Sequence, residues 1–414
     1  MMLLNRLNFF QPANFNLASA GILGTTQKVT LDRTWPIEEI LLIVHGTLAA
    51  TALTKAASTT TTNLLDGIAG IVKRVNLSVN DPIAGKPRTV VDFSGAGLLE
   101  YCQFAGLNLD AGTLEAVRTQ NTSLGIPASS NVRITYRIPL VHPLIADPLR
   151  TRMLLPVHLY QQDPVLTVDF ASNANGTELG AGAGSIFTTC VAELVLIRRN
   201  ITAALDAQIL KTGGYIEQDL LENPFNFGTG VSGEQRVPLN LPGYYTNVLL
   251  RQYLGGTALS RAEIDQTSTI GSESRWRLET GGSVIREWRW KHLRVINDWS
   301  RPLNGLASAI TFVAPTSGTG ATIPNNPAFY PGSGVTAATT LYQPNATAML
   351  DFLTDGLDSA AELGSVLDCY TPASRGLKME VIGPIASVLT NSTILFVGGH
   401  RITSPDISAF QSVR

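Results

Sequence analysis

The chain carries little charge and few aromatic side chains for its length. Charged residues make up 15% of its 414 residues and aromatic residues 7%, whereas an average soluble chain carries about 25% charged residues. Its net charge of −2 excludes the basic excess of proteins that coat nucleic acid. So little charge favours a chain that hides much of its surface against other chains. A large enzyme with a big core is the alternative.

Cysteine and histidine are too sparse and too scattered to predict a cofactor. Cys102, Cys190 and Cys369 lie far apart and form no CxxC pair, which excludes a disulfide framework and a zinc cluster. We expect them to be small buried residues. No HxH or HExxH spacing occurs among the five histidines, so the sequence predicts no metal site.

No segment has the length and composition of a membrane anchor. The first ten residues, MMLLNRLNFF, are interrupted by polar residues and lack the apolar core of a secretion signal. The most apolar stretch, Ile40 to Ala52, is too short to cross a bilayer. The sequence predicts a soluble or, at most, peripheral protein.

One glycine-rich motif resembles a nucleotide-binding fingerprint. Gly228 to Gly233 matches GxGxxG, but Pro224 precedes it, and Pro238 and Pro242 follow where the required helix would run. We therefore interpret the motif as a loop.

Strand patterns dominate the chain. Apolar and polar residues alternate with a period of two over 132–138, 74–79 and 377–381, as in strands with one buried face. The runs 191–197 and 394–397 are continuously apolar, which is typical of strands covered on both faces.

Long loops rich in Gly, Pro, Ser, Thr and Asn separate these strands. The segment 173–185 is predicted to hold neither helix nor strand, and 315–334 is similar and longer. The Ala- and Thr-rich segment 49–63 is a third candidate loop. Loops of this length in a compact protein usually have a function.

Helices are predicted at few places. The candidates are 95–106, one or two short helices within 341–367, and 201–211, which would end at Gly213 and Gly214. The last lies near the middle of the chain and is expected to connect two halves.

The two halves end alike. An apolar run followed by Arg199-Asn200-Ile201-Thr202 closes the first half, and one followed by His400-Arg401-Ile402-Thr403 closes the second, about 200 residues later. This spacing suits one all-β sandwich per half. The prediction is an all-β protein of two tandem sandwiches with a few short helices.

A short stretch mixes aromatic and basic residues. Within 286–294, Arg286, Trp288, Arg289 and Trp290 stand close together. Such a stretch can bind nucleic acid by charge and stacking. We favour instead a segment that buries its tryptophans, or a subunit interface, where Trp and Arg are enriched.

The N-terminus carries apolar residues among few charges. Leu3, Leu7 and Phe10 lie at helical spacing, so a short amphipathic helix that contacts lipid or a neighbouring subunit is one reading. A disordered end is the other. The candidate contact residues are Leu3, Leu4, Leu7, Phe9 and Phe10.

The order of several segments resembles the major coat protein of the tectiviruses, tailless icosahedral bacteriophages with an internal membrane. The stretches that carry the resemblance are 10–14 (FQPAN), 71–81 (IVKRVNLSVND), 132–140 (VRITYRIPL), 205–220 (LDAQILKTGGYIEQDL) and 377–402. None is a catalytic motif. Residues 259–372 have no counterpart, and neither does the loop at 315–334.

The resemblance implies a double jelly roll, with eight strands in each sandwich. The corresponding division is an inner-face N-terminal segment 1–26, a first jelly roll 27–200, a connector helix 201–213, a second jelly roll 214–403 and a C-terminal tail 404–414. Three chains would form a pseudo-hexagonal tile of an icosahedral shell over an internal membrane. The long loops would form its outer towers.

The resemblance also implies where the chain acts and with what. The protein would be made in the host cytoplasm and reside in the virion. Its partners would be further copies of itself, vertex and membrane proteins of the virion, and the membrane surface, without specific nucleic-acid binding. It would have no enzymatic activity and no cofactor.

Two other functions stay open at this point. One is a β-sandwich that binds or cleaves carbohydrate, although few aromatics, no convincing carboxylate pair and no export signal argue against it. The other is a minor vertex or spike component of a virion.

Overall fold

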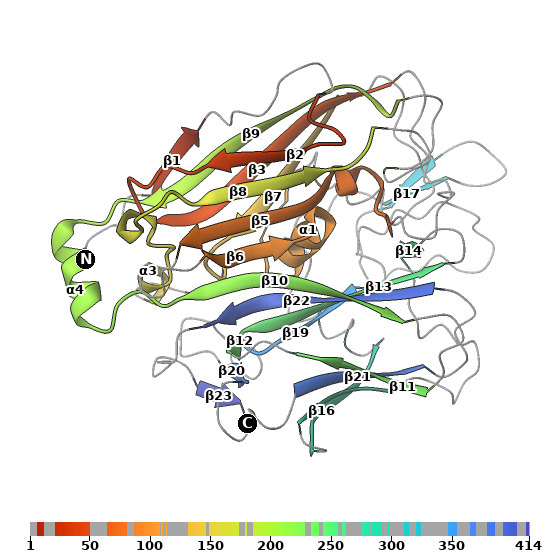
Figure 1. The fold of residues 1–414 in the computed structure, drawn as a ribbon. Helices are drawn as coiled ribbons and strands as arrows, with labels where there is room; N and C mark the ends of the chain where they lie inside the picture. The colour runs from red at the N-terminus through yellow and green to blue at the C-terminus, as the bar shows by residue number, and fades with distance from the viewer. Residues whose placement is uncertain are drawn as a thin grey trace.

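The computed structural model of the chain is dominated by β-strands (Figure 1). The structure describes residues 6–11, 21–49, 64–80, 87–107, 109–110, 113, 131–145, 149–173, 179, 185–227, 233–239, 243–255, 259–261, 275–280, 283–290, 293, 297, 310–313, 320–323, 347–353, 365–369, 379–385, 392–403 and 411–413.

The first half of the chain packs two four-stranded layers face to face. One layer has the order β1-β9-β3-β7, and the other has the order β2-β8-β5-β6. The strands are β1 (Arg6–Gln11), β2 (Thr26–Thr30), β3 (Ile37–Leu48), β5 (Val72–Asn80), β6 (Pro87–Phe93), β7 (Asn131–Pro139), β8 (Val165–Phe170) and β9 (Phe187–Arg199).

The second half repeats the arrangement. One layer follows the order β10-β22-β13-β19, and the other follows β11-β21-β15-β16. The strands are β10 (Gln218–Phe227), β11 (Gly233–Pro238), β13 (Asn247–Gly255), β15 (Arg275–Thr280), β16 (Ser283–Arg289), β19 (Thr347–Asp351), β21 (Met379–Ile385) and β22 (Ser392–Ile402).

Both halves have the same strand order. If the eight strands of each half are numbered along the chain, their layers read 1-8-3-6 and 2-7-4-5. This is the connectivity of an eight-stranded jelly roll, so the chain is a double jelly roll, as the resemblance implies. The first of these strands is β1, so the first jelly roll takes in part of the segment 1–26 that the sequence analysis sets apart.

The two jelly rolls share one sheet. Strand β6 of the first pairs in parallel with β10 of the second, with Val91 opposite Leu220 and Asp92 opposite Leu221. The layer β2-β8-β5-β6 therefore continues into β10-β22, and the jelly rolls lie side by side (Figure 1).

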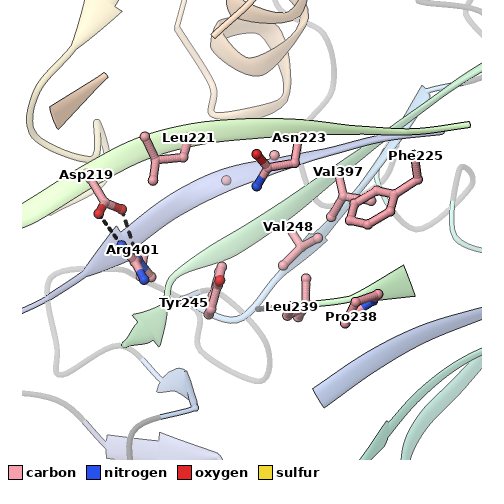
Figure 2. A pocket seen from close by; sticks show the side chains of 12 residues that line it. Asp219, Leu221, Asn223, Phe225, Pro238, Leu239, Tyr245, Val248, Val397 and Arg401 are labelled. Carbon is pink, nitrogen blue, oxygen red and sulfur yellow. Dashed lines mark hydrogen bonds and ion pairs between the residues drawn. The ribbon is translucent and has the colours of Figure 1, made fainter. Parts of the chain in front are cut away.

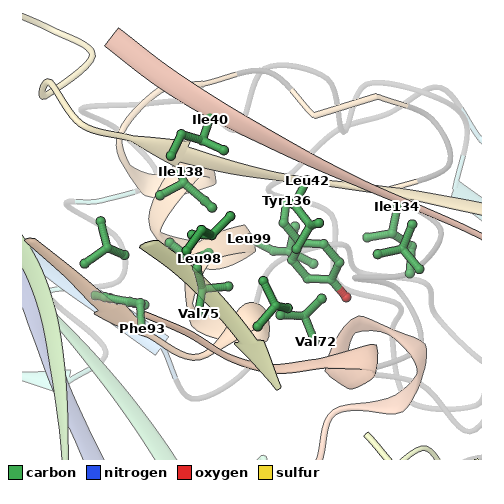
Figure 3. Close-up of a cluster of buried hydrophobic side chains, with 14 of the residues drawn as sticks. Ile40, Leu42, Val72, Val75, Phe93, Leu98, Leu99, Ile134, Tyr136 and Ile138 are labelled. Atoms are coloured by element: carbon green, nitrogen blue, oxygen red, sulfur yellow. The ribbon is translucent and has the colours of Figure 1, made fainter. Parts of the chain in front are cut away.

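The core of the first jelly roll follows from the period-two pattern. Ile134 and Ile138 of β7 and Ile40 and Leu42 of β3 face Val75 of β5, and all five are fully buried (Figure 3). Burying one such side chain stabilises the fold by roughly 1.5–3 kcal/mol. The strand predictions for 132–138 and 74–79 are confirmed.

The described residues also form short helices. They are α1 (Gly95–Phe104), α3 (Leu149–Arg152), α4 (Ala203–Lys211) and the 3-10 turns η1 (Gly67–Ile71) and η2 (Val157–Leu159). Helix α4 connects the jelly rolls: Thr202 caps its first turn, and Gly213 and Gly214 follow it with positive φ. The predicted helices at 95–106 and 201–211 are confirmed.

The remaining strands are short. Two of them, together with β19, correct the sequence analysis. They are β4 (Leu64–Leu65), β12 (Tyr244–Tyr245), β14 (Leu259–Arg261), β17 (Ile310–Val313), β18 (Gly320–Ile323), β20 (Ser365–Asp368) and β23 (Gln411–Val413). Strand β18 lies in the predicted loop 315–334, where it pairs with β17. Strands β19 and β20 stand in the segment 341–367, where helices were predicted.

The short helix that one of the two readings places at the N-terminus is a strand over the described residues. Arg6–Gln11 form β1, which pairs antiparallel with β9 from Leu194 to Arg199. The backbone bonds to β9 outweigh the helical spacing of Leu7 and Phe10. Leu3, Leu4, the motif at 228–232 and most of 173–185 lie outside the described residues.

Candidate functional site

Helix α1 of the first jelly roll contacts strands of the second. Its ten residues are all buried. Ser94 precedes it as N-cap, and the Oγ of Ser94 accepts a hydrogen bond from the backbone N–H of Gly97. On the facing strands, Thr347 donates to the carboxylate of Glu100 over 2.9 Å, and Asn247 donates to the hydroxyl of Tyr101 over 3.2 Å.

A buried ion pair lies where α1 begins. Arg251 of β13 and Glu222 of β10 are 0% and 1% exposed at their side chains, and Nε of Arg251 donates to Oε1 of Glu222 over 2.8 Å. The guanidinium also donates to Oγ of Ser94 over 2.6 Å, and the second carboxylate oxygen of Glu222 accepts from the backbone N–H of Ser94 over 3.0 Å. One ion pair of the second jelly roll thus holds the helix cap of the first.

Two further contacts extend this network across the junction. Arg251 donates to the hydroxyl of Tyr253, which in turn donates to the carboxylate of Asp66 at 2.9 and 3.0 Å. On the other side, Arg74 of β5 donates to the backbone carbonyl of Glu222 over 2.7 Å. We call Asp66, Arg74, Ser94, Glu222, Arg251 and Tyr253 the junction cluster.

The electrostatics of the junction cluster keep its arginines charged. Burial alone would lower the pKa of Arg251, but the attraction of Glu222 raises it above its ordinary value. Burial opposes the charge of Arg74 in the same way, and its hydrogen bond to Asp92 is the largest effect that raises its pKa. Both arginines therefore stay charged at neutral pH.

Two glycines make room for the junction cluster. A Cβ atom on Gly97 would lie 2.7 Å from Oε1 of Glu222, and one on Gly398 would lie 2.7 Å from the ring of Phe93. Gly398 belongs to β22 of the second jelly roll, whereas Phe93 belongs to β6 of the first. Without a side chain at Gly398, the jelly rolls approach closely at this point.

A pair of imidazoles lies elsewhere along the same junction. His142 follows β7, and His400 is on β22; their ring centroids are 5.6 Å apart. The ring nitrogens of His400 lie 2.9 Å from Oγ1 of Thr246 and 2.5 Å from Oε1 of Gln218. Complete burial lowers the pKa of His400 to about 3, so the ring is neutral at neutral pH.

A recess beside the shared sheet has no catalytic arrangement (Figure 2). Its empty volume is about 400 Å³, and apolar residues such as Tyr245 and Val248 supply much of its lining. Its one carboxylate, Asp219, and its one guanidinium, Arg401, form an ion pair with each other. No carboxylate pair of the kind that cleaves glycosidic bonds lines it.

The described part of the chain also holds no group of three or more metal-ligating side chains. No helix within those same residues is long and apolar enough to cross a membrane. Cys102, Cys190 and Cys369 are free and buried, as the sequence predicts.

The aromatic and basic stretch at 286–294 forms part of the second core. Trp288 and Trp290 are 7% and 0% exposed, and Trp290 packs against Trp276 with ring centroids 5.5 Å apart. Arg286 lies over the ring of Phe352, and burial lowers the pKa of Arg286. The stretch buries its tryptophans, as one of the two favoured readings predicts.

The predicted site residues and the junction cluster do not coincide. Of the N-terminal candidates, Leu7, Phe9 and Phe10 lie on β1, at the edge of the first jelly roll. The sequence analysis missed Glu222 and Arg251. The available signal was a charged residue inside each of two apolar strands, DLLENPF and VLLRQYL.

Solved structures share this architecture over nearly the whole chain. The crystal structure of the STIV major capsid protein matches with a TM-score of 0.54 at 16% identity, covering 96% of this chain and 97% of that chain. The atomic structure of Sulfolobus Turreted Icosahedral Virus gives a TM-score of 0.56 at 16% identity, covering 95% and 90%. The quasi-atomic model of the PBCV-1 virus capsid gives 0.52 at 11% identity, covering 98% and 96%.

No protein-family model matches the chain, and no curated protein matches its sequence. The structural matches establish the double jelly-roll fold.

Proposed function

We propose that this chain is the major capsid protein of an icosahedral virus. The observation that carries the proposal is the pair of complete jelly rolls joined through one sheet in a single chain. The structures that share this fold at a TM-score above 0.5 come from viral capsids. The role is structural rather than catalytic.

Three copies of the chain form the building block of the shell. Each copy supplies two similar sandwiches, so a ring of three presents six around its axis and approximates a hexagon. Hexagonal tiles cover a closed surface with repeated lateral contacts, and many weak contacts together make a stable shell. The low charge fraction of 15% suits the large buried contact areas that this requires.

The chain resides in the virion after synthesis in the host cytoplasm. The N-terminal segment that carries Leu3, Leu4, Leu7, Phe9 and Phe10 contacts the inner side of the shell, near an internal membrane. Vertex and membrane proteins of the virion are its other partners.

Burial within the chain reduces the candidate contact residues at 286–290 to the two arginines. Arg286 and Arg289 are only partly buried, whereas Trp288 and Trp290 are buried in the chain itself. The tryptophans then support the interface from beneath, and the arginines make its contacts.

Native mass spectrometry of the purified protein tests this proposal. A species with about three times the 44.3 kDa chain mass, stable to dilution, is the expected result. A monomer that persists at micromolar concentration would count against the capsid function.

A further inference from the structure

The junction cluster joins side chains of both jelly rolls around the fully buried pair Glu222 and Arg251. Asp66 and Ser94 come from the first jelly roll, and Glu222, Arg251 and Tyr253 come from the second. We infer that the junction cluster fixes the orientation of one jelly roll on the other and contributes little net stability. This inference holds whether or not the chain assembles into a shell.

Adhesion between the jelly rolls comes from apolar contacts. Leu220, Leu249 and Met349 belong to the second jelly roll, yet they pack in the hydrophobic core of the first. Apolar burial is non-directional, so these contacts hold the jelly rolls together without selecting one angle between them. A buried ion pair adds little to adhesion because the cost of removing both charges from water offsets their attraction.

Backbone pairing across the junction is also too short to select an orientation by itself. Two short parallel ladders cross it: β6 and β10 pair at two positions, Val91 with Leu220 and Asp92 with Leu221, and β4 and β14 pair at two others, Leu64 with Leu259 and Leu65 with Ser260. A register error in so short a parallel ladder sacrifices little backbone bonding. Some other directional contact has to specify the arrangement.

The hydrogen bonds of the junction cluster are directional and select one orientation. The planar guanidinium of Arg251 aims separate N–H groups at Glu222, Ser94 and Tyr253. A shift of the first jelly roll would remove Ser94 and leave buried donors and acceptors without partners, which is costly even where the bonds add little net stability. Gly398 adds to the selection because a Cβ atom at this position would lie 2.7 Å from the ring of Phe93.

Distances between two spin labels test the inference in the full-length protein. Lys28→Cys on β2 and Val284→Cys on β16 place labels at exposed positions of the first and second jelly rolls. The three native cysteines are buried, so the labels attach to the introduced ones. Labelled chain is diluted with unlabelled chain, so that pulsed electron resonance reports distances within one copy.

The decisive variant replaces the ion pair by apolar side chains, Glu222→Met with Arg251→Met. The original protein should give one narrow distance distribution, and the variant one that is roughly twofold broader or split, with a melting temperature within a few degrees. A milder variant, Asp66→Ala with Ser94→Ala, keeps the ion pair, removes the hydroxyl that accepts from Arg251 and the carboxylate that accepts from Tyr253, and should broaden the distribution too.

A matched control separates orientation from mere loss of charge. Asp219 and Arg401 form a buried ion pair between β10 and β22, both within the second jelly roll. Asp219→Met with Arg401→Met should leave the distance distribution narrow. A narrow distribution in either folded junction variant would overturn the inference, as would a failure of both junction variants to fold.

Discussion

His400 should make the protein sensitive to mild acid. Its imidazole is fully buried between the two jelly rolls, and burial lowers its pKa from 6.5 to about 3. In the unfolded chain the ring binds a proton near pH 6.5, whereas in the folded protein it stays neutral until about pH 3. The contribution of the neutral His400 ring to the free energy of unfolding is therefore fully present above the unfolded pKa. It is lost as the pH falls from 6.5 toward 3.

The size of the loss follows from the displaced pKa. One pH unit within this window costs up to about 1.4 kcal/mol, and a fall from about pH 6.5 to about pH 4.5 costs roughly 2 kcal/mol.

Denaturant unfolding at the two pH values measures this loss, and His400→Gln isolates it. Other acidic groups titrate in both proteins, so the quantity of interest is the difference between their pH dependences. Between the two pH values, the free energy of unfolding should fall by roughly 2 kcal/mol more in the original protein than in the variant. Thr246→Val is the matched control: it removes a hydrogen-bond partner of the ring, keeps the imidazole and should retain the steeper pH dependence. Equal losses in the original protein and His400→Gln would refute the reasoning.

Further substitutions probe packing and assembly. Tyr136→Phe removes a buried hydroxyl that donates to a backbone carbonyl over 2.8 Å, and denaturant titration should show a loss of about 1–3 kcal/mol for the carbonyl left unpaired. Trp290→Ala empties a fully buried site in the second core and should cost about 3–5 kcal/mol in the same assay, whereas Val284→Ala on the exposed surface should change stability by less than about 0.5 kcal/mol. Arg286→Glu with Arg289→Glu should shift the native mass from trimer toward monomer in a protein that still melts cooperatively, although losing the contact of Arg286 with Phe352 lowers the melting temperature; an unchanged trimer would remove these arginines from the interface.

The strands of the first jelly roll were predictable because each carries its own pattern. In β7 the apolar residues Val132, Ile134, Tyr136 and Ile138 alternate with polar ones and are the buried set. Helix α4 was equally predictable because the signal for its C-terminus, Gly213 and Gly214, is local. Such features need no knowledge of any distant part of the chain.

Features that depend on distant partners were not predictable. Residues 6–11 form a strand because β9, nearly 190 residues later, offers an edge to pair with. The partners in the junction cluster are similarly remote: Arg251 meets Glu222 across 29 positions and Ser94 across 157. A charged residue in an apolar strand signals that a partner exists but does not identify it.

Electron cryomicroscopy of particles from a culture that produces this chain tests the capsid function most directly. The account predicts a shell whose density accommodates three copies of the double jelly roll around each threefold axis, with six sandwiches in a pseudo-hexagonal ring. Particles whose shell density does not fit this chain, or from which the chain is absent, would contradict it.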